Sequence, residues 1–219
     1  FIYSIATVPT SILLALVLAY ILNNKVYCRK LLRMAFFIPY ISSAVALAAV
    51  FKFMFRDDGV INSILLALGI KNPPQWFVSL QLNKIPIIVM VIWTAVGYEL
   101  VIYMSALQSV PTSLYEAADI DRATGMQKFF YITLPMVSPT TFYLVIVRMI
   151  AVFKIFSSVN IMTMGSPSYA NTSMVVEIYG NAFGSYKFGY AAAQSMVLFV
   201  LILVITLLNF WGQKKWVHY

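Results

Sequence analysis

The first 22 residues of the chain contain no charged side chain, and most of them are apolar. A helix needs about 20 such residues to cross the hydrocarbon core of a bilayer, which is about 30 Å thick. Stretches that meet this requirement lie at about residues 1–22, 34–55, 85–108, 140–164 and 191–211. The sequence therefore predicts an all-α membrane protein in which five transmembrane helices form a single domain over residues 1–219.

The composition agrees with a lipid environment for most of the chain. Hydrophobic residues make up 62% of the sequence and charged residues 10%, whereas soluble domains have roughly 45–50% and 25%. These values exclude a soluble enzyme, a disordered segment and a nucleic-acid-binding module. The formal net charge of +8 is therefore attributed to cationic loops of a membrane protein, and no nucleic-acid partner is expected.

Residues for catalysis and metal binding are scarce. One cysteine, Cys28, and one histidine, His218, are too few for a disulfide or a Cys/His metal cluster, so no metal site is predicted. The chain has no G-x-x-x-x-G-K-[ST] loop for ATP and no H-E-x-x-H motif. Its four aspartates all fall in predicted loops, which argues against an intramembrane aspartyl protease. No catalytic residue and no cofactor are predicted for this chain.

Basic side chains predict the orientation of the spans, because Lys and Arg accumulate in cytoplasmic loops. The connection after the first span and the C-terminal tail carry six cations and no acid: Lys25, Arg29, Lys30, Arg33, Lys214 and Lys215. Alternation places the loop 111–139 in the cytoplasm with them, and the connections 56–84 and 165–190 outside. It also places Phe1 outside, so we expect that an N-terminal part with at least one more span is missing.

The loop 111–139 is the most informative segment. Ser113 and Glu116 have the S-x-x-E spacing of a capping box, which predicts a short helix that starts there. Gly125 is expected to end this helix in a left-handed conformation, and a second short helix at about 126–133 should stop before Pro135. The first helix has two small residues, Ala117 and Ala118, next to acidic side chains, which would suit close contact with a basic partner. The alternative interpretation is an ordinary solvated loop between two spans.

This loop resembles a motif of ABC-importer permeases. Glu116-Ala117-Ala118 and Ile132-Thr133-Leu134-Pro135 have the spacing of the EAA motif, E-A-A-x3-G-x9-I-x-L-P, with Arg122 at the glycine position. Further resemblances extend along nearly the whole chain, at Phe37-Ile38-Pro39, Leu107-Gln108-Ser109-Val110-Pro111, Thr163-Met164-Gly165-Ser166-Pro167 and Tyr179–Phe183. Together they resemble the carbohydrate branch of the family and, within it, the maltose-type first permease subunit.

The resemblance implies an architecture and partners. The five spans would belong to a six-helix permease core in a bacterial cytoplasmic (inner) membrane, with the EAA loop and the C-terminus in the cytoplasm. The chain would form a heterodimer with a second permease and bind two cytoplasmic ATPase subunits, which hold ATP and Mg²⁺. An external or periplasmic solute-binding protein would deliver a carbohydrate for uptake by alternating access.

The family also implies the role of the EAA helix, which sits in a cleft of the ATPase and passes its motion to the spans. Carried over to this chain, ATPase-coupling roles fall on Glu116, Ala117, Ala118, Asp119, Asp121 and Gly125.

Two charged residues, Glu99 and Arg148, lie well inside predicted spans. A charge at that depth costs about 2.5–3.5 kcal/mol on insertion scales, so it faces a cavity or a partner. The two residues either line a water-filled substrate path or form an ion pair that satisfies two buried charges. A secondary transporter or channel that uses Glu99 and Arg148 is the alternative to an ABC importer.

In the maltose-type permease, sugar contacts come from the middle of the spans that flank the EAA loop. The corresponding positions, together with the charged residues and one polar residue further along the fourth span, give a predicted substrate path of Thr94, Ala95, Tyr98, Glu99, Arg148, Val152, Ile155 and Asn160. Tyr98 offers an aromatic hydroxyl suited to a sugar, whereas Val152 and Ile155 lack the polarity expected there. Maltose itself is therefore not the expected substrate.

The charge balance at this depth leaves two interpretations. Arg148 and Lys154 together outnumber Glu99, which favours an acidic oligosaccharide, because guanidinium groups bind carboxylates and phosphates through paired hydrogen bonds. In the competing interpretation, Glu99 neutralises Arg148 while Lys154 extends outward, which leaves a site for a neutral sugar.

Overall fold

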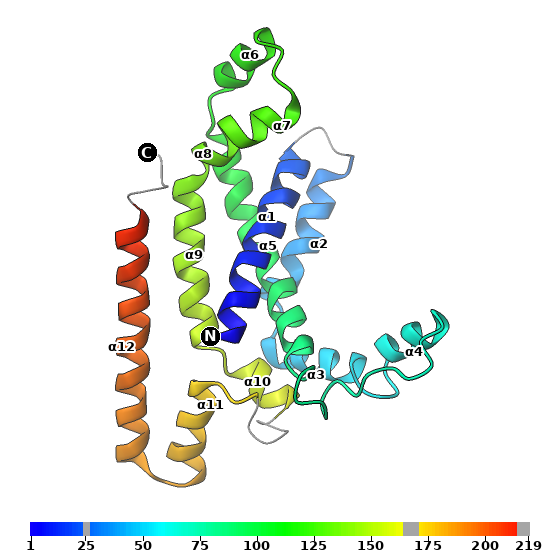
Figure 1. Cartoon of the computed structure of the whole chain (residues 1–219), viewed down its shortest axis with the longest axis vertical. Helices are drawn as coiled ribbons and strands as arrows, with labels where there is room; N and C mark the ends of the chain where they lie inside the picture. Colours follow the sequence, from blue (N-terminus) through cyan, green and yellow to red (C-terminus); the bar gives the residue numbers. More distant parts are fainter. Residues whose placement is uncertain (24–26, 164–170, 214–219) are drawn as a thin grey trace.

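The computed structural model describes residues 1–23, 27–163 and 171–213, and within these ranges every regular element is helical. Several residues used above lie outside the described ranges: Lys25, Met164 to Pro167 of the fourth motif, Lys214, Lys215 and His218. The long helices run along one axis, with the EAA loop at one end and several short helices at the other (Figure 1).

The helices in chain order are α1 (Ile2–Asn23), α2 (Arg29–Ile41), α3 (Ala44–Met54), α4 (Val60–Ala67), α5 (Ile85–Gln108), α6 (Thr112–Ile120), α7 (Gly125–Lys128), the π-helix η1 (Phe129–Thr133), α8 (Leu134–Met136), α9 (Ser138–Phe153), α10 (Ser157–Met162), α11 (Met174–Tyr179), the π-helix η2 (Gly180–Gly184) and α12 (Phe188–Gln213).

Three helices, α1, α5 and α12, are each long and apolar enough to cross a membrane. Their bounds agree within a few residues with three of the predicted spans. Two bent pairs raise the number of candidate spans to five: α2 with α3, and the segment Gly125–Met136 with α9. The predicted all-helical membrane fold is confirmed, and the two bends are new.

The second predicted span, 34–55, is not one straight helix. α2 begins at Arg29, ends at Ile41 and meets α3 at an angle of 98°. At the corner, Ser42 has an extended backbone (ψ 153°), and the hydroxyl of Ser43 accepts a hydrogen bond from the Ala46 amide, which caps α3. Serine side chains that cap a new helix compete with continuation of the old one, and apolar composition does not reveal this.

The fourth predicted span, 140–164, is also broken. α9 ends at Phe153 with Lys154 as its C-cap, and α10 starts at Ser157 after the non-helical residue Phe156. α10 packs against α3, and the Lys52 ammonium donates to the Ile161 carbonyl at 3.1 Å. Two short helices, α3 and α10, therefore close the end of the bundle that lies opposite α6 (Figure 1).

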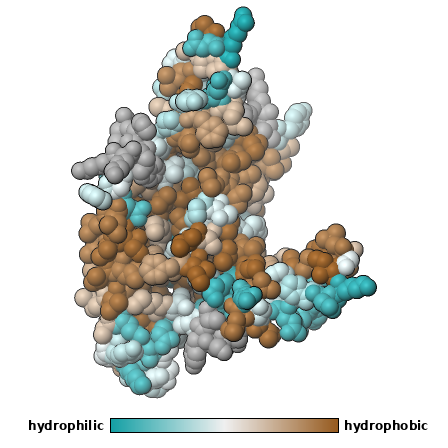
Figure 2. Space-filling view, viewed as in Figure 1, coloured by the Kyte–Doolittle hydropathy of each residue, from teal (hydrophilic) through white to brown (hydrophobic). Residues whose placement is uncertain are grey.

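α1 and α5 form the centre of the bundle, and α9 packs against both. Three small residues of α1, Ser11, Ala15 and Ala19, recur every fourth position and are fully buried, which lets neighbouring helices approach closely. In α12, by contrast, only Ala191 and Leu198 are buried. Figure 2 shows apolar side chains along the flanks and hydrophilic ones near both ends, as expected for a chain that crosses a bilayer.

α2 and α5 approach each other closely at Gly97. A Cβ atom added there would lie 2.0 Å from the carbonyl oxygen of Phe36, which is far inside van der Waals contact. The position therefore requires glycine because of space, not because of its backbone angles.

We expect Gly97→Ala to destabilise the protein by at least about 1–3 kcal/mol, because α2 must move away from α5 to admit the methyl group. The measurement is the thermal unfolding midpoint of the purified protein in detergent. Gly189→Ala in α12 is the matched control, since among the described residues no atom lies within 4 Å of the added Cβ. An unchanged midpoint for Gly97→Ala would show that α2 and α5 do not pack this closely.

Candidate functional site

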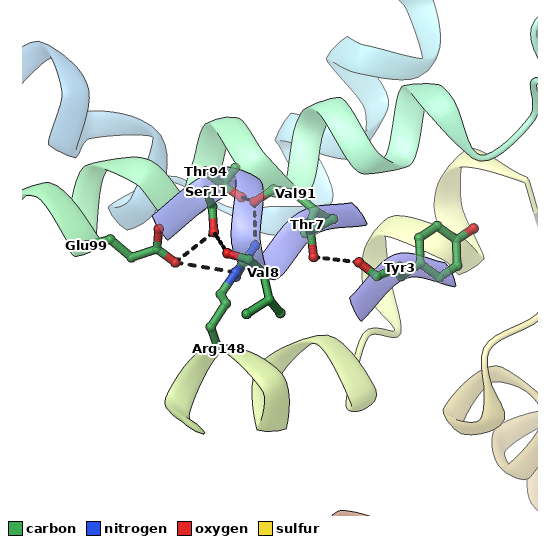
Figure 3. A network of polar contacts seen from close by, with 8 residues as sticks. All are labelled: Tyr3, Thr7, Val8, Ser11, Val91, Thr94, Glu99 and Arg148. Atoms are coloured by element: carbon green, nitrogen blue, oxygen red, sulfur yellow. Dashed lines mark hydrogen bonds and ion pairs between the residues drawn. The ribbon is translucent and has the colours of Figure 1, made fainter. Parts of the chain in front are cut away.

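A polar network joins α1, α5 and α9 in the apolar middle of the bundle (Figure 3). The Ser11 hydroxyl of α1 donates to Glu99 Oε1 of α5 at 3.0 Å. Arg148 of α9 donates through Nη2 to the Val91 carbonyl of α5 at 2.6 Å, and its Nε lies 3.6 Å from Glu99 Oε1. One carboxylate therefore connects three helices at the same depth.

The pairing of Glu99 with Arg148 compensates two charges that water hardly reaches. The Glu99 side chain is 2% exposed and that of Arg148 is 15% exposed. Removal of one partner from such a pair leaves an uncompensated buried charge. Two atoms, Glu99 Oε2 and Arg148 Nε, have no hydrogen-bond partner within the described part of the chain, so the pair is not saturated.

Two neighbouring cavities border Arg148. The first, of about 140 Å³, lies between α2, α5 and α9 and is lined by Tyr98 and Glu99 among others. The second, of about 180 Å³, reaches the α2–α3 corner and α10, at Ser42 and Ser158. Three residues line both cavities: Tyr40, Ala95 and Arg148. The Arg148 side chain therefore lies at the boundary between the two cavities.

Five of the eight predicted path residues come together at these cavities: Thr94, Ala95, Tyr98, Glu99 and Arg148. Of the three others, Val152 lies on α9 with Arg148, whereas Ile155 lies beyond the end of that helix at Phe153. Val152 and Ile155 instead border a third cavity, of about 180 Å³, beside α1 and α12. Asn160 lies on α10, beyond the break, and is not among the residues that line these three cavities.

One aromatic residue missing from the prediction, Tyr40, lines the first cavity, and a second, Tyr143, contacts the cavity residue Tyr98. The rings of Tyr40 and Tyr98 stack with centroids 4.9 Å apart, and the hydroxyls of Tyr98 and Tyr143 lie 3.3 Å apart. Tyr40 directly follows the Phe37-Ile38-Pro39 motif, which could have drawn attention to it. No sequence pattern marks Tyr143.

Ser11 was also missed, although a signal for it exists. Ser4, Thr7 and Ser11 follow a helical i, i+3, i+7 spacing in an otherwise apolar span, and all three are buried. A polar stripe on a transmembrane helix indicates the face that meets polar partners.

The helix α6 starts earlier than predicted. Its N-cap is Pro111, which provides no side-chain cap, and Ser113 lies inside the helix, so the predicted Ser113–Glu116 capping box is wrong. A capping box does form one helix later, where the Thr124 hydroxyl accepts from the Gln127 amide and the Gln127 side chain accepts from the Thr124 amide.

The turn after α6 depends on Arg122 and not on Gly125. Arg122 has a left-handed backbone (φ 56°), and two hydrogen bonds close the turn: Arg122 N–H to the Asp119 carbonyl and Ala123 N–H to the Ala118 carbonyl. This is a Schellman arrangement, whose left-handed position favours glycine. Gly125 instead begins α7. Arg122 stands where the spacing of the EAA motif has glycine, and it adopts the left-handed conformation that favours glycine.

The EAA-type helix projects from the end of the bundle (Figure 1). In α6, which the structure describes in full, no residue is buried. Glu116 and Ala117 are exposed, Ala118 is half-buried, and the apolar side chain of Ile120 is 83% exposed. An exposed helix with apolar and acidic side chains is suited to pack against a separate subunit.

Metal binding has no support in the described residues, where no three His, Cys, Asp or Glu side chains are grouped closely enough to hold an ion.

We expect Glu99→Gln to lower the free energy of unfolding by roughly 3–5 kcal/mol, because Arg148 would keep an uncompensated buried charge. The double variant Glu99→Gln/Arg148→Met should recover a large part of this loss. Denaturant or thermal unfolding in detergent measures both effects.

The matched control for this pair is Arg56→Met, which breaks the exposed Arg56–Asp58 ion pair and should cost no more than about 1 kcal/mol. Arg148→Met is measured alone as well. If the double variant lost as much stability as Glu99→Gln and Arg148→Met lose together when measured separately, Glu99 and Arg148 would not act as a pair.

Comparison with known proteins places these features in a family. The model of binding-protein-dependent transport system inner membrane components matches residues 11–216. A lactose transport system permease protein of Rhizobium radiobacter is 35% identical over 98% of this chain and 74% of its own length. An arabinooligosaccharides transport system permease protein of Bacillus subtilis is 33% identical over 94% of this chain and 67% of its own length.

Other similarities agree. An sn-glycerol-3-phosphate transport system permease protein of Agrobacterium fabrum is 32% identical over 100% of this chain and 74% of its own length. The fold matches that of a bacterial alginate ABC transporter, solved in complex with an alginate pentasaccharide-bound periplasmic protein, with a TM-score of 0.83, 24% identity, and coverage of 98% of this chain and 77% of that one. This chain belongs to the family of binding-protein-dependent transport system inner membrane components, as a permease subunit of an ABC importer and not an enzyme.

Proposed function

We propose that this permease takes up a carbohydrate, delivered by an external solute-binding protein, through the two cavities that meet at Arg148. The observation that carries the proposal is the stacked Tyr40–Tyr98 pair, which lines the first cavity together with Arg148; the Tyr98 hydroxyl lies 3.3 Å from that of Tyr143. Aromatic faces and hydroxyls suit the apolar and polar sides of a sugar ring. Similarity to permeases named for lactose and arabinooligosaccharides supports the same substrate class.

We propose further that the carbohydrate is neutral where it passes Arg148. The surplus positive charge expected at this depth required Lys154, but that residue is exposed at the end of α9 and lines neither cavity next to Arg148. Arg148 is compensated by Glu99 and by the Val91 carbonyl. The acidic oligosaccharide thereby loses its main support, and the competing interpretation is adopted.

Transport would proceed by alternating access, with a second permease completing the path as a heterodimer. Two cytoplasmic ATPase subunits would bind ATP and Mg²⁺, close, and pull on α6. The chain continues from α6 through α7 and η1 into α9, which carries Arg148, so a pull on α6 reaches the cavities by a direct covalent route. The alternative of a secondary transporter or channel is set aside, because the chain is an ABC-importer permease.

We expect Glu116→Lys to insert normally but to lose most of its ATPase subunit on co-purification, together with stimulated ATP hydrolysis. Glu116 is exposed on α6 and would meet basic side chains of the ATPase, so a lysine there would be repelled. Glu177→Lys, an equally exposed glutamate on α11, is the control and should retain the ATPase.

The same preparation tests the substrate. With the binding protein encoded alongside this chain, a neutral oligosaccharide should stimulate ATP hydrolysis and a uronate oligosaccharide of equal length should not. Stimulation by the uronate alone would contradict the proposal of a neutral substrate. Purification of the wild-type permease without any ATPase subunit would contradict the proposed coupling to ATPase subunits.

We also propose that α6 and the α1–α2 connection face the cytoplasm. Arg29, Lys30 and Arg33 at the start of α2 lie at the same end of the bundle as α6, in agreement with the positive-inside rule (Figure 1).

Cys28 provides a direct test, because it is a free, exposed thiol at this end. A membrane-impermeant thiol reagent should not label it in intact cells but should label it in inverted vesicles. Cys28→Ser/Ser185→Cys, which moves the thiol to an exposed residue before α12, should give the reverse pattern. Labelling of Cys28 from outside would invert the orientation of the whole chain.

A further inference from the structure

The helix α6 contributes no residue to a core, yet it must transmit force if it couples an ATPase to the spans. A helix held only by its two connections would swivel when pulled, and the movement would not reach α9. Side-chain contacts between α6 and the segment that leads into α9 are therefore informative. Two such contacts exist, and both start from the same face of α6.

The first contact is an ion pair between Asp119 of α6 and Lys128 at the end of α7. The Lys128 side chain is only 19% exposed, whereas that of Asp119 is 67% exposed. Lys128 thus presents a sheltered cation to the last turn of α6. Asp119 was grouped by its sequence with Glu116 as a contact for the ATPase, but its charge is already used within this chain.

The second contact is a hydrogen bond of 2.9 Å between the hydroxyls of Tyr115 and Thr133. The Thr133 hydroxyl also donates to the Lys128 carbonyl at 3.3 Å. A hydroxyl has one proton to donate, so Tyr115 is the donor to Thr133 whenever Thr133 donates to the Lys128 carbonyl. Thr133 is completely buried at the end of η1, where the chain turns towards α9.

These contacts close a ring. Tyr115 and Asp119 are one helical turn apart on α6, and Lys128 and Thr133 are joined to each other through the Lys128 carbonyl. Glu116 and Ile120, each next to a ring residue in sequence, are exposed. The helix therefore has an inner face that holds the elbow formed by α7 and η1, and an outer face that is free for a partner.

We propose that Tyr115, Asp119, Lys128 and Thr133 are positioning residues that hold α6 at a fixed angle to the elbow, so that motion of the ATPase is passed to α9. This inference rests on the proposed function, because it assigns a mechanical role within the coupled importer. The ring residues do not contact the ATPase or the substrate. Their loss disconnects ATP hydrolysis from transport while the complex stays assembled.

The test uses the complete transporter, reconstituted in lipid vesicles with its binding protein. In Tyr115→Phe/Asp119→Asn the ATPase subunits should remain bound and hydrolyse ATP, but the sugar taken up per ATP should fall by roughly an order of magnitude, since one hydrogen bond and one ion pair are lost. Tyr131→Phe, an exposed tyrosine of η1, is the matched control for loss of a hydroxyl.

Exchanging the two charges tests whether coupling depends on the ion pair itself or on the identity of Asp119 and Lys128. Lys128→Asp alone places an aspartate opposite Asp119 and should uncouple the transporter. The double variant Asp119→Lys/Lys128→Asp should restore sugar uptake per ATP. Unchanged coupling in Tyr115→Phe/Asp119→Asn would overturn the proposal, and so would loss of the ATPase subunits from that variant, because Asp119 would then be a docking residue. Wild-type vesicles without ATP-driven uptake would instead refute the proposed function.

Discussion

The compensation of Glu99 by Arg148 is the interaction on which the arrangement of the central helices depends. In an apolar bundle the two charges cannot be left to solvent, so α5 and α9 must keep the depth at which they meet. The Ser11 hydroxyl brings α1 into the same arrangement. The two cavities exist beside this network because the guanidinium extends across the space between helices and does not fill it.

Broken helices shape the surroundings of this network. The corner between α2 and α3 and the gap between α9 and α10 both turn the chain sideways at the same end of the bundle, where α3 and α10 pack together. Backbone groups freed by such breaks must find partners within the protein, because lipid offers none. Ser43 and Lys52 supply some of these partners, which explains polar residues inside stretches that are otherwise apolar.

Much of the fold could be predicted from the sequence, because hydrocarbon thickness sets the length of a span and charges set its orientation. The bounds of α5 were predicted to the residue. The breaks were not, since a local feature such as the Ser43 cap at the α2–α3 corner is lost in the average hydropathy of a long window. In the loop, a glycine was expected at the left-handed turn for good steric reasons, yet the chain accepts Arg122 there, with two backbone hydrogen bonds holding the turn.

The candidate path was predictable only in part. Glu99 and Arg148 were found because charges are conspicuous in a span, and Tyr98 because the resemblance places it there. Val152 and Ile155 were also assigned by the resemblance; Val152 lies on α9 and Ile155 beyond its end at Phe153, and both border the third cavity. Tyr40 enters from α2, and Tyr143 of α9 meets Tyr98 of α5; such tertiary proximity leaves no mark on periodicity.

The contact at Gly97 limits how α2 can move against α5. Sliding α2 along α5 would bring a residue with a side chain against the Phe36 carbonyl, so the packing resists a change of register between the two helices. α9 meets α5 through polar side-chain contacts instead: the Glu99–Arg148 ion pair, the Arg148 hydrogen bond to the Val91 carbonyl, and the hydroxyl pairs Tyr98–Tyr143 and Tyr103–Thr141. A slide of α2 along α5 would therefore create a steric clash, whereas a shear of α9 against α5 would exchange polar contacts.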